Sequence, residues 1–287
     1  MRLRWPAALL ALALTGCNEP APKGPPPSPA IWQVTAPGGQ QGWLFGTIHA
    51  LPDGYDWRTP QITEALDQSG VLVVEVADLA DSAAAAREFA ARSTSPGLPP
   101  ILARVPAADR AALAAALQDA GIDPASLART ESWAAALLLA NATADGLDSA
   151  NGVDRALLAG QRPVIGLESF ARQFDLFDRL AAQDQAVLLV EAVKETGGED
   201  EEAELARAWL RGDTARLERE AGTGILADPE LRQALLVGRN REWATRIAPL
   251  LDQGRKPFVA VGAGHMLGPD GLPALLAARG YRVQRLR

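Results

Sequence analysis

Phe258-Val-Ala-Val-Gly-Ala-Gly-His265 joins a short apolar run directly to a glycine-rich loop that ends in histidine. Far earlier in the chain, Leu44-Phe-Gly-Thr-Ile-His49 repeats this pattern, and these two phrases contain the only two histidines of the sequence. Imidazole is suited to proton transfer near neutral pH and to binding transition metals. Gly46, Gly262 and Gly264 predict positive φ or close backbone approach beside the histidines. The two phrases therefore predict one site built from distant parts of the chain.

Six apolar runs of strand length occur in the sequence, and several lack polar alternation, as in strands buried on both faces. They are residues 31–35, 43–48, 71–76, 163–167, 258–261 and 281–286. Between them, from about residue 80 to 160 and from about 169 to 251, apolar positions recur at helical spacing. The predicted fold class is α/β, with a mixed central sheet built from N- and C-terminal strands and a large helical middle region.

The first residues resemble a bacterial lipoprotein signal. Arg2 and Arg4 precede an apolar segment, residues 7–14. This segment is too short to cross a bilayer as a helix, which takes about 20 residues. Leu14-Thr-Gly-Cys17 follows and contains the only cysteine of the chain. An internal disulfide and a cysteine metal cluster are therefore excluded. We predict that residues 1–17 are a signal peptide with its lipobox cysteine, and that Cys17 is lipidated. A conventional secretory signal with an incidental cysteine is the alternative.

The rest of the chain divides into a tether and a folded body. Residues 18–30 are rich in proline and predict an extended tether, while residues 31–287 are long enough for one large domain or two that share a sheet. Asn18 directly after the cysteine favours the outer membrane, facing the periplasm. The net charge of −7 argues against nucleic-acid binding and against electrostatic adsorption to anionic lipid. Membrane attachment would therefore depend on lipidated Cys17.

Two glutamates lie at the carboxyl ends of predicted strands, where ligands collect in open α/β sheets. Alternation places Glu75 on the same face as Val71 and Val73. An ionised carboxylate there needs a cation or several donors, and a purely structural ion pair with a buried arginine is the alternative. Glu168 is a weaker candidate for base or ligand, because it equally suits the N-terminus of a helix that begins at Ser169.

Two histidines with one or two carboxylates suit a divalent metal that keeps open positions for water. His49, His265 and Glu75 are the predicted ligands, and manganese, cobalt or zinc are the candidate ions. Such a metal lowers the pKa of bound water, and a carboxylate that is not a ligand can act as general base. The same residues suit metal-free catalysis with one histidine as base. Two core imidazoles bonded to the backbone are the non-functional alternative.

The chain resembles the TraB/GumN family, which also contains the animal Tiki proteins and the enterococcal PrgY-type proteins. The matching motifs cover almost the whole body in the expected order, and the paired GxxH phrases are the most specific. They are Leu44-Phe-Gly-Thr-Ile-His49, Val73-Val-Glu-Val76, Gly152-Val-Asp-Arg155, Pro163-Val-Ile-Gly-Leu-Glu-Ser169 with Gln173, Arg239-Asn240, and Val261-Gly-Ala-Gly-His265 through Gly271-Leu272 to Gly280-Tyr-Arg-Val283.

This resemblance implies a mixed α/β fold in which His49, His265 and Glu75 form the active site. Tiki-like relatives are divalent-metal-dependent proteases, so the resemblance implies metal-assisted hydrolysis of a peptide or small acyl substrate. Arg239 and Asn240 would line the site, holding a substrate carbonyl or orienting Glu75.

The wider superfamily implies other functions. Its erythromycin-esterase-like members imply metal-free hydrolysis with histidine as base. Its ChaN-like members are haem-binding lipoproteins, and for haem the candidate axial ligand in this sequence is Tyr55. A peptide-binding protein that retains the site without turnover is a further alternative.

Overall fold

The computed structural model describes residues 26–48, 51, 55–143, 152–195 and 199–286. Within them, one sheet of six strands has the order β4-β3-β5-β2-β1-β6. β4, β3, β5 and β2 are parallel, whereas β1 is antiparallel to both of its neighbours. The strands are β1 (Ile31–Thr35), β2 (Gln41–Thr47), β3 (Val71–Val76), β4 (Val164–Glu168), β5 (Pro257–Gly262) and β6 (Arg282–Arg285). The predicted mixed sheet is confirmed.

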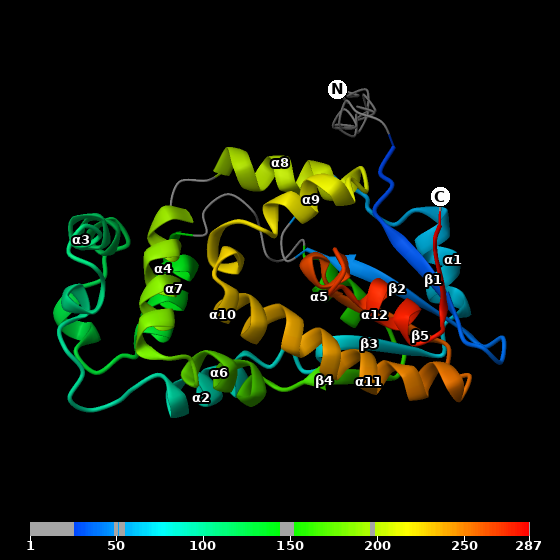
Figure 1. Cartoon of the computed structure of the whole chain (residues 1–287), viewed down its shortest axis with the longest axis horizontal. Helices are drawn as coiled ribbons and strands as arrows, with labels where there is room; N and C mark the ends of the chain where they lie inside the picture. Colours follow the sequence, from blue (N-terminus) through cyan, green and yellow to red (C-terminus); the bar gives the residue numbers. More distant parts are fainter. Residues whose placement is uncertain (1–25, 49–50, 52–54, 144–151, 196–198, 287) are drawn as a thin grey trace, which may run out of the picture.

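Helices fill the predicted middle region and flank the last two strands (Figure 1). Before β4 they are α1 (Pro60–Gln68), α2 (Ser82–Arg92), η1 (Ile101–Arg104), α3 (Arg110–Asp119), η2 (Pro124–Leu127), α4 (Ser132–Thr143) and α5 (Val153–Leu158). After β4 they are α6 (Phe170–Asp178), α7 (Ala182–Glu195), α8 (Glu199–Leu210), α9 (Thr214–Glu220), η4 (Gly224–Ala227), α10 (Pro229–Arg232), the π-helix η5 (Gln233–Val237), α11 (Gly238–Asp252), η6 (Ala263–Met266) and α12 (Leu272–Ala278).

The two faces of the sheet pack against different helices, because alternate side chains of each strand point to opposite sides. Phe45, Leu72 and Phe258 pack on one side with Ile62 of α1 and Trp209 of α8. On the other side, Val71, Val73, Val259 and Val261 pack with Trp243, Ile247 and Leu251 of α11 and Leu272 of α12. Glu75 follows Val71 and Val73 by alternation, so its side chain lies on the α11 side of the sheet.

A separate helical lobe has a core of its own. Its buried residues come from α3, α4, α7 and α10, with Trp133 at 0% exposure. Phe89, Phe174 and Phe177 surround Trp133, with ring centroids 5.5–6.0 Å from it. Figure 1 shows α3, α4 and α7 at the end of the molecule opposite β1 and the C-terminus. Part of the predicted middle region therefore forms a second packed body, and α6, which begins two residues after the end of β4, connects this body to the sheet.

Parallel pairing brings the carboxyl ends of four strands to one edge of the sheet. β2 and β5 are neighbours, with Thr47 opposite Gly262. A Cβ at Gly46 would lie 2.9 Å from Ala263 Cα, so this position needs glycine for close approach. A Cβ at Gly262 would lie 3.3 Å from Glu75 Oε1, a tight contact that would require the carboxylate to shift slightly. Gly264 has neither a close neighbour nor positive φ, and the prediction for it is wrong.

The end of the predicted tether is attached to the body. Ser28 N–H donates to Leu210 O at 2.6 Å, and Ala30 is buried. Residues 18–25 and Cys17 lie outside the described residues, so the signal and the start of the tether remain predictions. Among the helices that are described, none has the length and apolar character needed to cross a membrane.

Candidate active site

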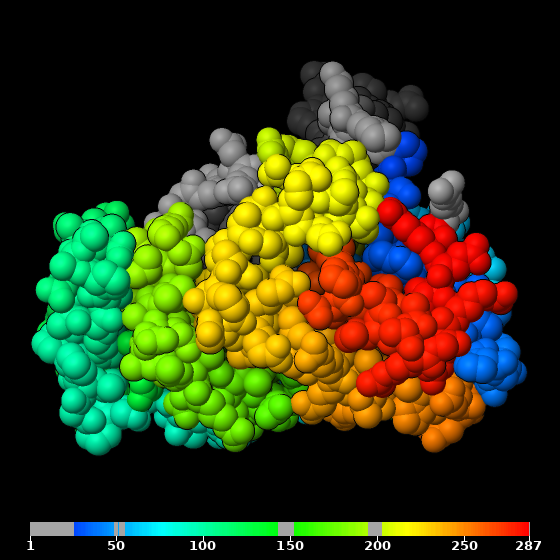
Figure 2. Space-filling view, viewed as in Figure 1, coloured from blue at the N-terminus to red at the C-terminus, as the bar shows by residue number. Residues whose placement is uncertain are grey.

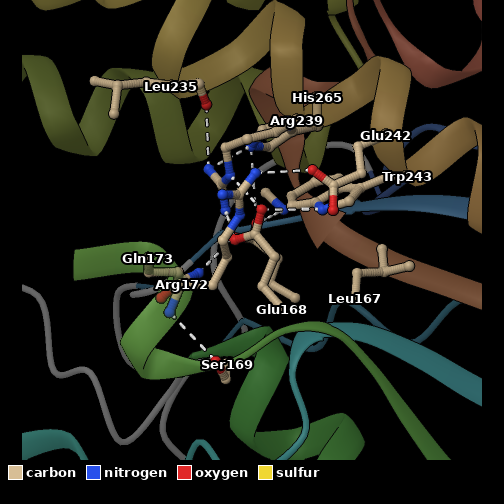
Figure 3. A network of polar contacts seen from close by, with 12 residues as sticks. Leu167, Glu168, Ser169, Arg172, Gln173, Leu235, Arg239, Glu242, Trp243 and His265 are labelled. Atoms are coloured by element: carbon tan, nitrogen blue, oxygen red, sulfur yellow. Dashed lines mark hydrogen bonds and ion pairs between the residues drawn. The ribbon is translucent and has the colours of Figure 1, made fainter. Parts of the chain in front are cut away.

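Five predicted site residues meet at the carboxyl edge of the parallel strands. Figure 3 shows three of them, Glu168, Arg239 and His265, with their neighbours. Glu75 is the last residue but one of β3, Glu168 is the last residue of β4, and His265 lies in η6 directly after β5. Arg239 and Asn240 begin α11, which crosses this side of the sheet. The strands alone bring the two carboxylates and the imidazole together, and α11 adds the guanidinium and the amide.

Arg239 lies at the centre of the cluster, and all five of its N–H groups have partners. Nε and Nη2 donate to the two oxygens of Glu168 at 3.0 and 2.9 Å, and Nη2 also donates to Glu75 Oε2 at 2.7 Å. Nη1 contacts Leu235 O and His265 Nε2, both at 3.2 Å. A guanidinium has five N–H donors. Arg239 therefore orients Glu75, and it can hold a substrate carbonyl only by exchanging one of these contacts.

Glu75 is held as a carboxylate. Oε1 accepts the backbone N–H of Gly262 at 2.9 Å, while Oε2 accepts from Arg239 and from Gln173 Nε2 at 3.3 Å. Burial by itself would raise the pKa of Glu75, but the charges of protonated His265 and of Arg239, together with the Gly262 hydrogen bond, outweigh it and lower the pKa. The carboxylate is thus ionised at neutral pH and has a fixed orientation.

Asn240 fixes the tautomer of His265. The amide nitrogen of Asn240 donates to Asp270 O at 2.8 Å, so its oxygen is the atom 2.6 Å from His265 Nδ1. That oxygen only accepts, so Nδ1 carries the proton. Nε2 faces a donor of Arg239, and its lone pair lies toward Arg239 and Glu75, whose Oε1 is 4.0 Å away. In its neutral form the imidazole therefore presents its basic nitrogen to the carboxylate, whereas in its protonated form it adds the positive charge that lowers the pKa of Glu75.

Glu168 lies beneath Arg239, and its side chain is only 1% exposed. In addition to Arg239, its Oε1 accepts the indole N–H of Trp243 at 3.1 Å. Ser169, rather than Glu168, caps α6 by accepting from Arg172 N. A direct role of Glu168 as base or ligand would require Arg239 to move, whereas its role as the anchor of Arg239 follows from the contacts. Trp243 also lies against the His265 ring, with centroids 4.4 Å apart.

A further buried carboxylate, Asp154, lies at the end of β2. Thr47 Oγ1 donates to Asp154 Oδ1 at 2.7 Å, and Val153 N–H donates to Ile48 O at 3.1 Å. These contacts connect Gly152-Val-Asp-Arg155 to the residues just before His49. His49 itself lies outside the described residues, so its predicted place in the site stays a prediction.

The donor types that are described suit part of a metal site. Nε2 of His265 and Oε1 of Glu75 lie 4.0 Å apart, whereas two ligands of a tetrahedral ion with bonds of about 2.0–2.2 Å are about 3.3–3.6 Å apart, so the two side chains would have to move slightly closer to share a metal. A metal at Nε2 would replace the contact from Arg239. Apart from His49 and the other residues not described, no group of three or more His, Cys, Asp or Glu side chains is arranged to hold a metal. The predicted set of three ligands therefore depends on His49.

The sequence matches a model of the TraB/PrgY/gumN family over residues 30–285. The chain belongs to the TraB/PrgY/gumN family. The match extends from β1 to the last residue of β6 and so includes the whole sheet and every described site residue. Comparisons with curated proteins and with solved structures found no match.

Two contributors to this TraB/PrgY/gumN site were not predicted as site residues. The sequence indicates Gln173 only as part of a family motif, and it does not single out Trp243. Trp243 follows Arg239 by four residues on α11 and thus shares its helix face, which places the ring 4.5 Å below the guanidinium. Helical spacing from Arg239 could have indicated Trp243. The Gln173 contact depends on how α6 packs, which the sequence spacing does not specify.

Replacing Asn240 with alanine should lower any activity that depends on His265 about 10- to 100-fold, because the imidazole loses the side chain that orients it. Asn240 is completely buried, so the loss of its two partners should also destabilise the fold by about 1–3 kcal/mol. Nitrogen NMR of the imidazoles measures the tautomer directly and involves only two histidines. Asn240→Asp, which retains an acceptor, is the control. An unchanged His265 tautomer in Asn240→Ala would show that the amide does not fix it.

Proposed function

We propose that this TraB/PrgY/gumN protein is a hydrolase that cleaves a peptide or related acyl bond with the help of a divalent metal. The observation that carries the proposal is the oriented pair of Glu75 and His265. An ionised carboxylate and a basic imidazole nitrogen lie 4.0 Å apart at the carboxyl ends of the parallel strands of the sheet. Such pairs serve as metal ligands or as general bases.

The residues of the chain have separate tasks in this proposal. His265 Nε2 and Glu75 Oε1 provide two donors, and His49, which follows the neighbouring strand, is the proposed third. Manganese, cobalt and zinc are the candidate ions, and such an ion supplies a Lewis acid and lowers the pKa of bound water. Arg239 keeps Glu75 ionised and in place. Glu168 and Trp243 hold Arg239, and Asn240 holds the imidazole.

Metal content and peptide cleavage test the proposal together. The chain from Asn18 onward, purified without chelator and reconstituted with manganese, cobalt or zinc, should contain about one metal ion per molecule. His265→Ala should lose it, because it removes one of about three protein ligands. Arg241→Ala, on the exposed face of α11, is the control that should retain it. Equal metal content in both variants would refute the assignment of His265 as a ligand.

Other outcomes would support different functions. Cleavage of a peptide library that survives metal removal would favour the metal-free mechanism with histidine as base. A Soret band would favour haem binding. The contacts of Tyr55 do not favour that alternative, because Tyr55 is half-buried and packs against the core cluster on the α1 side of the sheet. Peptide binding without cleavage would favour a binding protein.

We also propose that the protein is a lipoprotein of the cell envelope, held at the outer membrane through Cys17 and facing the periplasm. The lipobox phrase and the proline-rich segment support this location. Cys17→Ser should abolish labelling by a radioactive fatty acid and release the protein from the membrane fraction or leave it uncleaved. Continued lipid labelling of this variant would contradict the proposed anchor.

A further inference from the structure

A pocket beside the cluster has no role in the proposal above. It has a volume of about 530 Å³ and lies between α6 of the helical lobe and the continuous segment of α10, η5 and α11. Sites for small ligands have volumes of about 300–1,000 Å³. On the face that Figure 2 shows, the green chain around α6 and the gold chain around α10 adjoin. Arg239 lines the pocket and also contacts Glu75 and His265.

Apolar side chains line the pocket from both sides. Leu176 of α6, Pro229 of α10 and Ala234 of η5 line it. On either side of Leu176, Phe174 and Phe177 pack against the core of the helical lobe. Leu176 belongs to none of the three core clusters of the described residues. Its side chain therefore supplies apolar surface to the pocket rather than to the core.

Three of the four charged residues that line the pocket, Arg172, Glu242 and Arg239, are paired; the fourth, Glu230, is exposed and has no ion pair among the described residues. Arg172 Nη2 contacts Glu242 Oε2 at 3.0 Å, and both side chains line the pocket. Arg239 is neutralised by Glu75 and Glu168. An anion would have to disrupt these pairs and would also meet Glu230, and a cation could pair only with Glu230, which is exposed to water, so that the pair would contribute little. An uncharged apolar group loses no hydration of a charge by entering. The pairing thus favours an uncharged occupant.

We propose that the pocket binds an apolar side chain of a peptide substrate, next to the bond that reaches Glu75 and His265. This inference rests on the proposed hydrolase function and adds the substrate preference to it: a peptide with a residue such as leucine at this position. The site lies where the helical lobe meets the sheet, so the lobe supplies the selectivity and the sheet supplies the chemistry.

Binding of capped pentapeptides tests the preference without turnover. Four peptides with leucine, alanine, lysine or glutamate as the central residue are titrated into the full chain carrying Glu75→Gln, using calorimetry. The leucine peptide should bind about tenfold more tightly than the lysine and glutamate peptides. Burial of the leucine side chain is favourable, whereas burial of a lysine or glutamate side chain removes the water that hydrates its charge. Equal affinities, or no binding of the leucine peptide up to millimolar concentration, would overturn the proposal.

A charge placed in the pocket should reverse the order. With Leu176→Asp added, the lysine peptide should bind more tightly than the leucine peptide. Leu138→Asp is the matched control, because Leu138 is 39% exposed on α4 and does not line the pocket. The control should retain the original order, and the same reversal in both variants would overturn the assignment.

Cleavage of the same peptides by the wild-type protein, which retains Glu75, separates this inference from the proposed function. Cleavage with no preference for leucine, unaffected by Leu176→Asp, would overturn the pocket assignment and leave the hydrolase intact. Binding that prefers leucine, with no cleavage, would overturn the hydrolase and leave the pocket assignment intact.

Discussion

Replacing Arg239 with methionine is expected to lower the free energy of unfolding by about 3–5 kcal/mol at pH 7, because it leaves two buried carboxylates without their cation. The side chain of Arg239 is 12% exposed and that of Glu168 is 1% exposed, so water cannot replace the guanidinium. Burial by itself would lower the pKa of Arg239, but the hydrogen bonds to Glu168 and the charge of Glu75 raise it. The guanidinium is therefore charged throughout the pH range in which carboxylates titrate.

The difference in the free energy of unfolding between the wild type and Arg239→Met should become smaller as the pH falls. With Arg239 present, the pKa of Glu75 is lowered on folding, so its stabilising contribution is complete above the unfolded value near 4.5 and is lost as the pH falls through the folded value. Without Arg239, two of the causes that lower the pKa of Glu75 are lost while the charge of His265 and the Gly262 hydrogen bond remain, so the stability of the variant depends less on the ionisation of Glu75 and falls less in acid. Urea unfolding at about pH 7 and pH 3.5, on either side of the unfolded value, measures this difference between the wild type and the variant.

Arg241→Met is the matched control for this prediction. Arg241 is the second residue after Arg239 on α11, but its side chain is 63% exposed and its contact with Asp270 is 3.9 Å long. Exposed pairs of this kind contribute about 0–1 kcal/mol. Equal destabilisation of Arg239→Met and Arg241→Met at neutral pH would show that the buried cluster does not stabilise the fold.

The sheet could be predicted because its strands are apolar runs bounded by glycine, proline and charge. Alternation also placed Glu75 on the face of Val71 and Val73, and that face is covered by α11. Ligands of open sheets bind at the carboxyl ends of the strands. This rule predicts that Glu75, Glu168 and His265 lie close together, and all three contact Arg239. These predictions needed only local pattern and one rule of topology.

The ion-pair network could not be predicted, because it depends on how α11 lies across β3 and β4. Nothing in the spacing indicates that one guanidinium binds both Glu75 and Glu168, or that Leu235 in the π-helix accepts from it. The sequence left open whether Glu75 is functional or forms a structural pair with an arginine. The pair exists, and the carboxylate also faces His265. The two interpretations are therefore compatible.

Replacing Glu75 with glutamine should reduce kcat/KM for a cleaved peptide by at least about 10²–10³-fold, because the amide neither binds a metal as a carboxylate does nor accepts a proton from water. The shape is retained, but one oxygen that accepts from Gly262, Arg239 or Gln173 becomes a donor. We therefore expect an additional loss of stability of about 1–3 kcal/mol, which circular dichroism and urea unfolding would measure separately from activity.

The pH dependence distinguishes a direct role of Glu75 from a general loss of structure. Because the pKa of Glu75 is lowered, its carboxylate is ionised throughout the range of about pH 5.5–8, and the ratio of wild-type to variant kcat/KM should stay constant across it. Glu64→Gln, on the exposed side of α1, should match the wild type at each pH. A Glu75→Gln variant that is folded and cleaves within threefold of the wild-type rate would place the chemistry elsewhere, and the metal and base roles of Glu75 would both be abandoned.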